Sequence, residues 1–560
     1  MTPQETLENA VLCVTSGRFA EAITLCEQCL KAQPTHVGAW NLLGVAYRGN
    51  HSLLQSVQAH ERALELAPDD TDSRIYLGES LLQCNRISDA LTHLQKAVQM
   101  RPESAHAWSS LGYAQTLHKD FESAITALET AKRLDPTNPD ILNRLGLAYR
   151  GAKQTDAAID HYQQAIRLRP NFAQALNNLG AAQQLKLQFN EALVSYNQAL
   201  EIQPEYLSVW NNLGTLFQSQ HHLPEAIQAY QKAQRIDPKY FQAHVNEGHA
   251  RLLMGDFGIG WLKHEYRWLA TRTNPQRSFT QPLWRGEESL AGKTILLHSE
   301  QGLGDTIQFI RYPEPLTQLG ATVLLEIQPS LLRLAATGPG VHSVHTYGNS
   351  LPAFDFHCPL MSLPLAFKTT LETIPNQTPY LSAPTDALIK WKAIVPRGAN
   401  LKVGIVWRGN PTHENDANRS VPFTLLEPLL DLNHADFVNL QLGLSDPESN
   451  AFHQRSNCMD PTGEILDYAD TAALITQLDL VISADTSVAH LAGALGKPVW
   501  ILLPFSPDWR WMLDRKDSPW YPSAQLFRQP TPQAWMPVIS ALTTSLSTVA
   551  QAFNSSTADQ

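Results

Sequence analysis

The feature that most constrains the fold of this chain is a proline that recurs at one fixed spacing through its first half. The unbroken series is Pro34, Pro68, Pro102, Pro136, Pro170, Pro204 and Pro238. A period of about 34 residues is typical of repeat proteins in which pairs of helices stack side by side. Proline ends each pair because it lacks an N–H donor and its ring cannot continue a helix.

Large and small residues keep the same period. On the first helix of each unit, a large residue, a leucine and a glycine recur, as in Trp40, Leu43, Gly44, Trp108, Leu111, Gly112, Trp210, Leu213 and Gly214. On the second helix, small residues recur as Ala22, Ala90, Ala124, Ala158, Ala192 and Ala226, and as Ala63, Ala97, Ala131, Ala165, Ala199 and Ala233. Small residues let neighbouring helices approach closely. The pattern resembles the tetratricopeptide family over residues 3–268, with seven regular units.

An eighth unit departs from the pattern. It keeps Gly248 but has Gly260 where the earlier units have alanine, and Trp261 and Trp268 follow. Terminal repeats are usually atypical because they cap the stack or pack against something else. We therefore interpret the eighth unit as the coupling between the repeat array, residues 1–270, and the next domain.

Composition bounds the class of protein. A chain of 560 residues suffices for about three to four domain-sized units, and a net charge of −11 argues against a nucleic-acid-binding surface. Without a run of 18 apolar residues or a basic leader, the sequence predicts a soluble, cytoplasmic protein with no membrane span. Cys26 and Cys29 occupy packing positions of one repeat helix, which favours reduced thiols. Asp70 and Asp72 spell a D-x-D motif in a turn between repeats, and we expect no metal site there.

After Trp268 the repeat pattern ends. Residues 271–292 are polar and rich in turn formers, which predicts a linker. Apolar strands then alternate with helices in two series, residues 293–398 and 399–545, and this alternation predicts parallel α/β sheets. The expected fold is an α-solenoid followed by two Rossmann-like halves that face a cleft, with residues 546–560 as a disordered tail. Ligands bind such sheets at the carboxyl ends of the strands.

The first strand of the first half ends in a glycine turn, "HSEQGLGDTIQ". Gly302 and Gly304 allow a tight turn, and Asp305 opens the following helix. A carboxylate at this edge of the sheet can accept the proton of an attacking hydroxyl or amide. Aspartate is also a preferred helix-capping residue, so capping alone explains Asp305 equally well. Glu300 is the other carboxylate near this strand end.

A second turn, "ISADTSVAHLAG", follows a buried strand of the second half. Asp485 ends the strand, Thr486 and Ser487 begin a helix, and His490 lies one turn further on. The N–H groups at a helix start attract phosphate, and the two hydroxyls add donors. His490 would donate to a diphosphate or stabilise a leaving group. The alternative is an ordinary capped helix with a buried histidine.

The loop "VWRGNPTHENDANRS" follows the first strand of the same half. Arg408, Asn410 and Arg419 offer positive charge and amide donors toward the same cleft, and arginine suits bidentate contact with phosphate. A solvated loop without a ligand explains each of these residues equally well.

Both turns resemble the signature regions of the ADP-heptose heptosyltransferase-like family, over about residues 293–530. These are glycosyltransferases of the GT-B type, with two Rossmann-like domains and in general no metal. The resemblance implies that Asp305 is the general base and that a basic residue, Arg419 or Arg408, contacts phosphate. It also implies that the nucleotide-sugar donor binds the second half and the acceptor the first. The implied donor-binding positions are Asp485, Thr486, Ser487, Val488 and His490, and we expect Gly302 and Gly304 to contribute to donor binding as well.

The layout of repeats followed by a transferase resembles bacterial tetratricopeptide–glycosyltransferase fusions, including those that glycosylate flagellin. Typical heptosyltransferases lack the repeats, so the layout favours a protein acceptor recruited by the array. The transferred group stays open among hexosyl, heptosyl and nonulosonyl. Asn178, Asn212 and Asn246 recur at the repeat period, and their amides could hydrogen-bond an extended acceptor backbone. Polar filling between helices is the alternative.

Two further alternatives remain. Trp509, Trp511, Trp520 and Tyr521 follow the last apolar strand, and they either line the sugar–nucleotide pocket or fill a core or lid. The rival to a transferase is a non-catalytic adaptor, in which the repeats scaffold an assembly and the α/β part only binds a nucleotide or partner.

Overall fold

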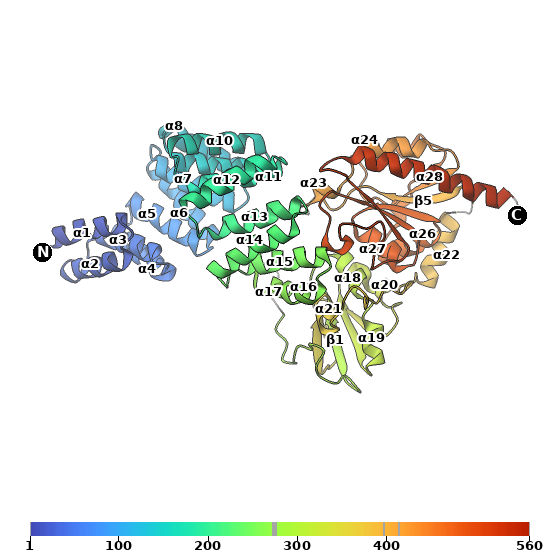
Figure 1. The fold of residues 1–560 in the computed structure, drawn as a ribbon. Coiled ribbons are helices and arrows are strands. Elements are labelled where there is room, and N and C mark those ends of the chain that lie inside the picture. Colours follow the sequence, from blue (N-terminus) through green and yellow to red (C-terminus); the bar gives the residue numbers. More distant parts are fainter. Residues whose placement is uncertain (1, 271–276, 396–397, 413–414, 559–560) are drawn as a thin grey trace. The chain divides into compact units, whose positions relative to one another are not determined.

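The computed structural model describes residues 2–270, 277–395, 398–412 and 415–558. It divides into two compact units, Met1–Asn212 and Leu213–Gln560 (Figure 1). The division falls inside helix α13 (Leu207–Ser219). The repeat helices continue to Ala270, as expected, but the last of them belong to the same compact unit as the sheets.

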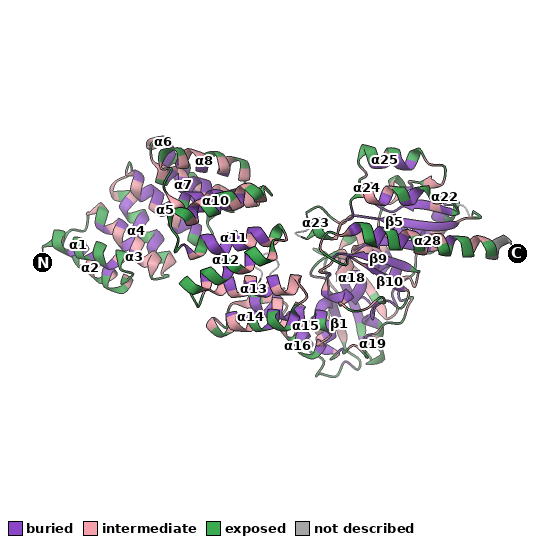
Figure 2. Cartoon of the chain, turned by 45° about the horizontal axis from the view of Figure 1, so that its top comes forward, coloured by how far each residue is buried: buried purple, intermediate pink, exposed green. Residues whose placement is uncertain are grey.

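The first unit is built from helix pairs. These are α1 (Pro3–Thr15), α2 (Phe19–Ala32), α3 (Val37–Gly49), α4 (Leu53–Leu66), α5 (Thr71–Gln83), α6 (Ile87–Met100), α7 (Ala105–Leu117), α8 (Phe121–Leu134), α9 (Pro139–Gly151), α10 (Thr155–Leu168), α11 (Ala173–Leu185) and α12 (Phe189–Ile202). The periodic alanines of this unit are buried between these helices. Figure 2 shows buried residues along the contacts between the helices. The predicted solenoid of tetratricopeptide repeats is confirmed.

The periodic glycines mark the closest approach within each helix pair. A Cβ built on Gly146 would lie 2.4 Å from Cε1 of Tyr162, and one on Gly180 would lie 2.7 Å from Cε1 of Tyr196. No side chain fits at such distances unless the aromatic ring moves. In both contacts the tyrosine follows its glycine at the same distance along the chain. The glycine and the tyrosine therefore both recur at the repeat period.

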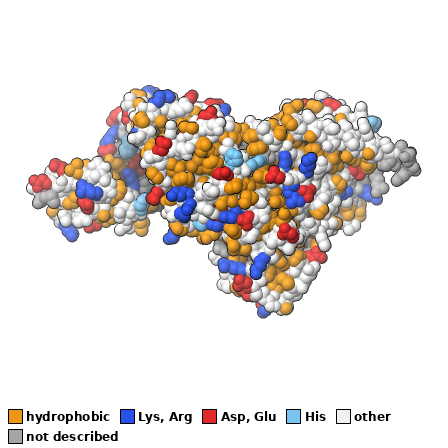
Figure 3. All heavy atoms as spheres, in the orientation of Figure 1, with side chains coloured by type: hydrophobic (Ala, Val, Ile, Leu, Met, Phe, Trp, Pro, Cys, Tyr) orange, Lys and Arg blue, Asp and Glu red, His pale blue; other side chains and the backbone are white. Residues whose placement is uncertain are grey.

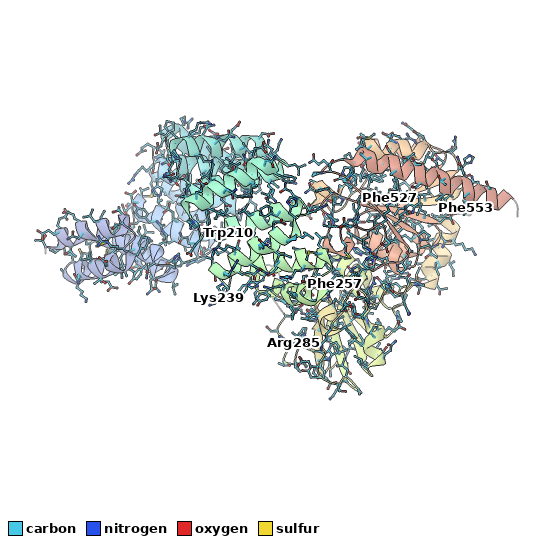
Figure 4. The ribbon with its side chains drawn as sticks, in the orientation of Figure 1. Trp210, Lys239, Phe257, Arg285, Phe527 and Phe553 are labelled. Carbon is cyan, nitrogen blue, oxygen red and sulfur yellow. The ribbon has the colours of Figure 1, made fainter. Side chains whose placement is uncertain are left out.

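The periodic prolines and tryptophans are partners in one hydrogen bond. The indole N–H donates to the carbonyl oxygen of the preceding periodic proline, at Trp40–Pro34 (2.8 Å), Trp108–Pro102 (2.8 Å) and Trp210–Pro204 (2.9 Å). Figure 4 labels Trp210. The bond closes the turn between successive units, which explains why the two residue types recur together.

The turn inside each helix pair uses a left-handed residue. The φ angle is positive once in every unit, at Gly17, His51, Asn85, Lys119, Lys153, Leu187, His221 and Gly255. Glycine adopts this conformation freely, whereas other residues do so at a cost. The non-glycine members therefore hold backbone strain.

The second unit begins with the last repeat helices, α13 to α17. They comprise the end of α13, α14 (Leu223–Ile236), α15 (Phe241–Met254), α16 (Phe257–His264) and α17 (Arg267–Ala270). Phe257, labelled in Figure 4, and Trp261 belong to a hydrophobic core that also contains residues of both sheets. The indole N–H of Trp261 donates to the carbonyl oxygen of Thr369 (3.0 Å). The interpretation of the eighth unit as a coupling element is confirmed.

The first sheet has four parallel strands in the order β3-β2-β1-β4. They are β1 (Thr294–His298), β2 (Thr322–Ile327), β3 (Val341–Thr346) and β4 (Phe356–Pro359). Its helices are α18 (Leu303–Phe309), α19 (Pro313–Gln318), α20 (Leu332–Ala335) and α21 (Leu363–Ala366), with 3-10 turns η1 (Pro329–Leu331) and η2 (Leu360–Ser362). In register, Leu296 of β1 lies between Leu324 of β2 and His357 of β4.

The second sheet has six parallel strands in the order β10-β9-β8-β5-β6-β7. They are β5 (Leu401–Val406), β6 (Ala435–Asn439), β7 (Cys458–Met459), β8 (Leu480–Ala484), β9 (Val499–Leu503) and β10 (Ala524–Arg528). Its helices and 3-10 turns are α22 (Thr385–Ile394), α23 (Asp416–Arg419), α24 (Phe423–Leu426), η3 (Glu427–Asp431), α25 (Asp446–His453), η4 (Thr462–Glu464), α26 (Tyr468–Thr476), α27 (Ser487–Ala494), η5 (Trp509–Trp511) and α28 (Trp535–Ala558). Parallel sheets confirm the predicted α/β class.

Two segments differ from the sequence prediction. Residues 271–276 of the predicted linker lie outside the described residues. The rest of it joins the first sheet: Leu283 bridges to His357, and Trp284 is buried in the core. An apolar side chain that fills the core explains why this segment is more than a linker.

The expected disordered tail is wrong for residues 546–558, which continue helix α28. Leu542, Leu546 and Ala550 are buried at four-residue spacing and pack with the strands of the second sheet. An amphipathic stripe of this kind holds a helix on a sheet. The polar residues that follow obscure the stripe in the sequence.

The strained turns predict a stabilising substitution. Lys153 is exposed with φ of 61°. We expect Lys153→Gly to raise the free energy of unfolding by about 0.5–1 kcal/mol, because glycine relieves the left-handed strain at some cost in chain entropy. The measurement is denaturant unfolding followed by helical circular dichroism. Lys153→Ala is the control and brings no gain, since alanine keeps the strain; a gain as large as that of glycine would contradict the explanation.

Candidate functional site

The two turns that the sequence singles out, one in each sheet, lie against each other. The first joins β1 to α18 and the second joins β8 to α27. A Cβ built on Gly304 would lie 2.9 Å from Cδ2 of His490 and 3.6 Å from Cα of Ser487. This contact leaves no room for a side chain at Gly304. The structure thus brings the predicted glycine turn of the first half to the predicted helix start of the second.

Asp305 lies in the first turn of α18 and has two partners. Its Oδ2 accepts a hydrogen bond from the backbone N–H of Gly302 (2.8 Å), and its Oδ1 forms an ion pair with the guanidinium of Arg510. The first contact is the capping role that the sequence left open. The second joins the two sheets. The side chain of Asp305 is 19% exposed, so solvent still reaches the carboxylate.

Arg510 is the central residue that the sequence analysis missed. It lies in η5, after β9, and is buried. Its Nε donates to Oε1 of Gln308 (2.5 Å), and its Nη1 donates to Oδ1 of Asp508 (2.9 Å). Burial opposes the charge, but the carboxylates of Asp508 and Asp305 outweigh it and raise the pKa of Arg510. The guanidinium is therefore a fixed positive charge beside Asp305.

The helix start at α27 is confirmed. Thr486 is the N-cap, and its Oγ1 accepts a hydrogen bond from the N–H of Val488 (3.3 Å). The hydroxyl of Ser487 lies 2.6 Å from that of Tyr468. Burial, with the nearby carboxylate of Asp508, raises the pKa of Asp485. This turn thus places a partly buried carboxyl group with a raised pKa beside a helix N-terminus.

The structure separates the two arginines that the sequence treats as alternatives. Nη1 of Arg419 donates to the carbonyl oxygen of Asp485 (3.1 Å), so Arg419 reaches the turn before α27. The guanidinium of Arg408 instead forms an ion pair with Glu448 of α25. Asn410 is exposed, and its Oδ1 accepts from the N–H of Thr412 (3.0 Å) in a local turn. Of the three, only Arg419 contacts the second signature turn.

His490 is buried beneath aromatic rings. Its Nδ1 lies 2.9 Å from the hydroxyl of Tyr521, and its ring stacks on Trp511 at 5.3 Å between centroids. Burial, together with the nearby charge of Arg510, lowers the pKa of His490 to about 3. The imidazole is therefore neutral near pH 7 and can exchange hydrogen bonds without adding positive charge.

The asparagine series is used inside the repeat array. Nδ2 of Asn178, which is buried, donates to Oδ1 of Asn143 (2.9 Å), and Nδ2 of Asn212 donates to Oδ1 of Asn177 (2.9 Å). In the second unit, Asn246 accepts from Nε2 of Gln242 (2.9 Å). For Asn178 this contact favours polar filling between helices over contact with an acceptor backbone. Its amide links neighbouring units, as the polar-filling alternative holds.

The aromatic cluster after β9 is mostly core. Trp511, Trp520 and Tyr521 are fully buried, whereas Trp509 lines a cavity. The guanidinium of Arg510 also lies over the ring of Trp509, 4.3 Å from the ring centroid. The core alternative therefore holds for three of the four residues.

The other motifs of the repeats are structural. Cys26 and Cys29 are buried in the core of the first units. Asp70 caps α5 by accepting from the N–H of Ser73 (2.8 Å), and Asp72 pairs with Arg101 (2.8 Å). None of the helices in the described ranges combines the length and apolar character of a membrane span. Positive and negative side chains both occur over the repeats and the α/β region in Figure 3.

A cavity of about 470 Å³ lies at the carboxyl end of β1. The residues that line it come from the last repeat helices, from the segment after β1 and from η5. They include His249, His264, Arg267, Glu300, Asp508 and Arg510. A neighbouring cavity of about 320 Å³ shares Trp268, Glu300 and Gln301 with the first. Pockets of this size hold small molecules.

Arg267 ties the repeats to this cavity. Its Nε and Nη2 donate to the two carboxylate oxygens of Glu300 (2.7 and 2.8 Å), and both side chains are buried. Arg267 falls one repeat period after Ala233, so it stands where the earlier units have alanine. That substitution is the signal by which the sequence could have revealed it. Arg510 has no such signal, because its partners Asp305 and Gln308 lie far away along the chain.

Comparison with known proteins agrees with the repeat architecture. Residues 32–235 match the family model described as the C-terminal domain of cilia and flagella-associated protein 70, a tetratricopeptide-repeat model. The first half of the chain is a tetratricopeptide-repeat array. The array is similar to the APC/C hetero-tetramer Cut9–Hcn1, with 17% identity, a TM-score of 0.39 and coverage of 43% of this chain and 48% of that one.

Two further proteins are similar to the chain. Protein FlbA of Caulobacter vibrioides is 28% identical over 320 residues, which is 53% of this chain and 53% of FlbA. The chain thus spans about half the length of this curated relative. YrrB, described as a TPR protein with an unusual peptide-binding site, is 23% identical with a TM-score of 0.26, over 33% of this chain and 96% of YrrB.

The glycine contact between the turns predicts a destabilising substitution. Gly304→Ala places a methyl group against the ring of His490, and the two turns must separate to accept it. We expect the free energy of unfolding to fall by about 1–3 kcal/mol, the usual cost of overpacking. The measurement is thermal unfolding by calorimetry. The matched control is Gly302→Ala, whose Cβ would meet only Oδ2 of Asp305, at 3.1 Å; an equal loss in both variants would contradict the explanation.

The Arg267–Glu300 pair predicts a second stability difference. Arg267→Ala leaves the Glu300 carboxylate buried without its bidentate partner, so we expect a loss of about 3–5 kcal/mol in unfolding free energy. The control is Arg515→Ala, which removes a 2.7 Å pair with the exposed Asp517 and costs at most about 1 kcal/mol. Urea unfolding of both variants compares them. Equal losses would show that burial does not set the value of the Arg267 pair.

Proposed function

We propose that this chain is a glycosyltransferase that moves a sugar from a nucleotide-sugar donor to a protein held by its repeats. The observation that carries the proposal is the contact between Gly304 and His490. The sequence resemblance assigns these two turns to acceptor activation and to donor binding. A transferase needs both functions within reach of one bond, and the turns touch although they come from different sheets.

The strand orders support two Rossmann-like halves. Numbered within each sheet, the orders are 3-2-1-4 and 6-5-4-1-2-3, the order of doubly wound nucleotide-binding sheets. In such sheets the ligand binds where the strand order reverses, beyond the carboxyl ends of the strands. In the second sheet that place lies between β5 and β8. There Arg419, from the loop after β5, contacts the carbonyl oxygen of Asp485 after β8.

We assign the donor diphosphate to this place. The N–H groups at the start of α27 and the guanidinium of Arg419 both favour a negative charge there. His490, which is neutral, would act as a hydrogen-bonding partner rather than as a charged acid. Arg510 would stabilise the departing nucleotide, because a fixed charge aimed at developing negative charge costs no reorganisation during the reaction.

We assign acceptor activation to Asp305. Its carboxylate oxygens can accept a proton, and the side chain is 19% exposed, so a substrate hydroxyl or amide can reach it. Proton transfer by a positioned base typically contributes about 10²–10⁴-fold to a rate.

The repeats of the first unit offer a place for the acceptor. A groove of about 390 Å³ is lined by apolar residues of α1 and α3, including Val11 and Val37, and by the carboxylates of Asp70 and Asp72. Such a surface fits a peptide that carries an apolar residue next to a basic one. The apolar residue would lie against the two valines, and the basic one would lie beside Asp70, since Asp72 is already paired with Arg101.

The test is the release of nucleotide from UDP-, GDP-, ADP- and CMP-linked sugars. We expect slow release by the wild-type chain with at least one donor, and a fall of about 10²–10⁴-fold in Asp305→Asn with donor affinity preserved. Asparagine can still accept the hydrogen bond from Gly302, so the helix start is retained.

The matched control is Asp479→Asn. Asp479 also accepts a backbone hydrogen bond, from the N–H of Lys402 (2.9 Å), but it lies before β8, at the opposite edge of the sheet. This variant should keep the wild-type rate. A fully active Asp305→Asn would reduce Asp305 to a helix cap. A wild-type chain that releases no nucleotide from any donor would favour the non-catalytic adaptor.

A further inference from the structure

The eighth repeat unit differs from the others at the positions that face the cavity beside β1. Arg267 replaces an alanine that six earlier units share, as at Ala199 and Ala233. His264 follows Gly248 at the position where three of the earlier units have the tyrosine that packs on the glycine. Arg267 introduces a charged group where the earlier units bury alanine, and His264 stands where the earlier units have tyrosine, leucine or, at His60, another histidine. Packing within the array does not require them.

Both of these residues line the cavity beside β1. Arg267 and His264 line it, and His249 of α15 lies beside them, with 5.6 Å between the centroids of the two imidazole rings. Helix α15 also packs against η5, which supplies Arg510 to the same cavity, and Asp508 directly precedes η5. The cavity is therefore lined jointly by the repeat array and by the segments after β1 and β9.

The charges that line the cavity are balanced. Arg267 is paired with Glu300, and Arg510 with Asp508 and Asp305. An anionic ligand would meet the carboxylates, and a cationic one would meet the guanidinium groups. Burial lowers the pKa of both His249 and His264, which favours neutral imidazoles. Nδ1 of His264 lies 3.4 Å from Nη1 of Arg267, so Nε2 is the nitrogen of His264 that is left for a ligand. A neutral ligand rich in hydroxyl groups fits this set of partners.

The position of the cavity in the fold further restricts which ligand it can bind. The cavity contains Glu300 and Met361, which follow β1 and β4, the two strands between which the order of the first sheet reverses. It also contains Arg510, which holds Asp305. A ligand here lies beside the turns to which the proposed function assigns the reaction.

We propose that this cavity binds the sugar group of the donor, and that the eighth repeat unit, through His264 and its neighbours, determines which sugar is accepted. This inference rests on the proposed transferase function. It assigns sugar selection to the repeat array, whose other units serve only the acceptor in that proposal.

The experiment compares the affinity of the full-length chain for each nucleotide-sugar with its affinity for the nucleotide alone. The probes are UDP-N-acetylglucosamine with UDP, GDP-mannose with GDP, and CMP-N-acetylneuraminate with CMP, measured by titration calorimetry. The ratio of the two affinities isolates the contribution of the sugar. In His264→Leu, which installs the residue found at Leu94 and Leu128, we expect that ratio to fall about ten- to hundredfold, with nucleotide affinity unchanged.

Two further variants keep the test decisive. Gln242→Ala changes an exposed residue of α15 that lines the same cavity, so it reports even if His264→Leu fails to fold, and its ratio should also fall. His60→Leu is the matched control. His60 is a buried histidine at the same repeat position, but it lies in helix α4 of the compact unit Met1–Asn212, far along the chain from the cavity. Its ratio should equal that of the wild type.

The outcomes separate this inference from the proposed function. If the sugar strengthens wild-type binding and both cavity variants keep the wild-type ratio, the inference is overturned while the transferase proposal stands. The same holds if nucleotides bind but no sugar adds affinity. If the wild type neither binds nor cleaves any of the probes, the proposed function itself fails.

Discussion

The ion pair between Arg510 and Asp305 fixes how the two sheets meet. Arg510 is buried, and separating it from its carboxylates would leave charges without partners in a poorly solvated place, which is far costlier than losing an exposed pair. Its remaining hydrogen bonds, to Gln308 and Asp508, hold the guanidinium in one orientation. Because Asp305 and Gln308 lie on α18 and Arg510 follows β9, the arrangement sets the position of one sheet against the other. The contact between Gly304 and His490 lies directly beside this ion pair, since Gly304 precedes Asp305.

The same physical device joins the repeats to the sheets. Arg267 reaches from α17 to Glu300 beyond β1, and Trp261 brings a large apolar surface and one hydrogen bond into the shared core. Burial of the Trp261 indole contributes favourable free energy to this interface. The Arg267–Glu300 ion pair restricts how the repeat helices can be oriented against the first sheet. The last repeat helices are thus a structural part of the α/β region, and the cavity at the carboxyl end of β1 is incomplete without them.

Much of this was predictable, for reasons that concern locality. The periodic sequence repeats the same local contacts, such as the hydrogen bond from Trp108 to Pro102. Each repeat unit therefore gives the same evidence for the solenoid fold. The turns at Gly304 and Thr486 are local strand-to-helix motifs and were equally visible. Contacts between distant segments were not: nothing in the sequence pairs Arg510 with Asp305, and nothing distinguishes Arg419 from Arg408 until the loop is folded. The period of Asn178 did not decide between an acceptor contact and a bond between neighbouring units, because it is consistent with both.

The boundary between the two compact units has a consequence for how such a chain can evolve. It lies within the continuous helix α13, between Asn212 and Leu213, and every residue that lines the cavity beside β1 comes after it. Whole repeat units can therefore be gained or lost before α13 while each residue of the cavity keeps its neighbours. The number of repeat units can in this sense change without altering the residues that surround the cavity.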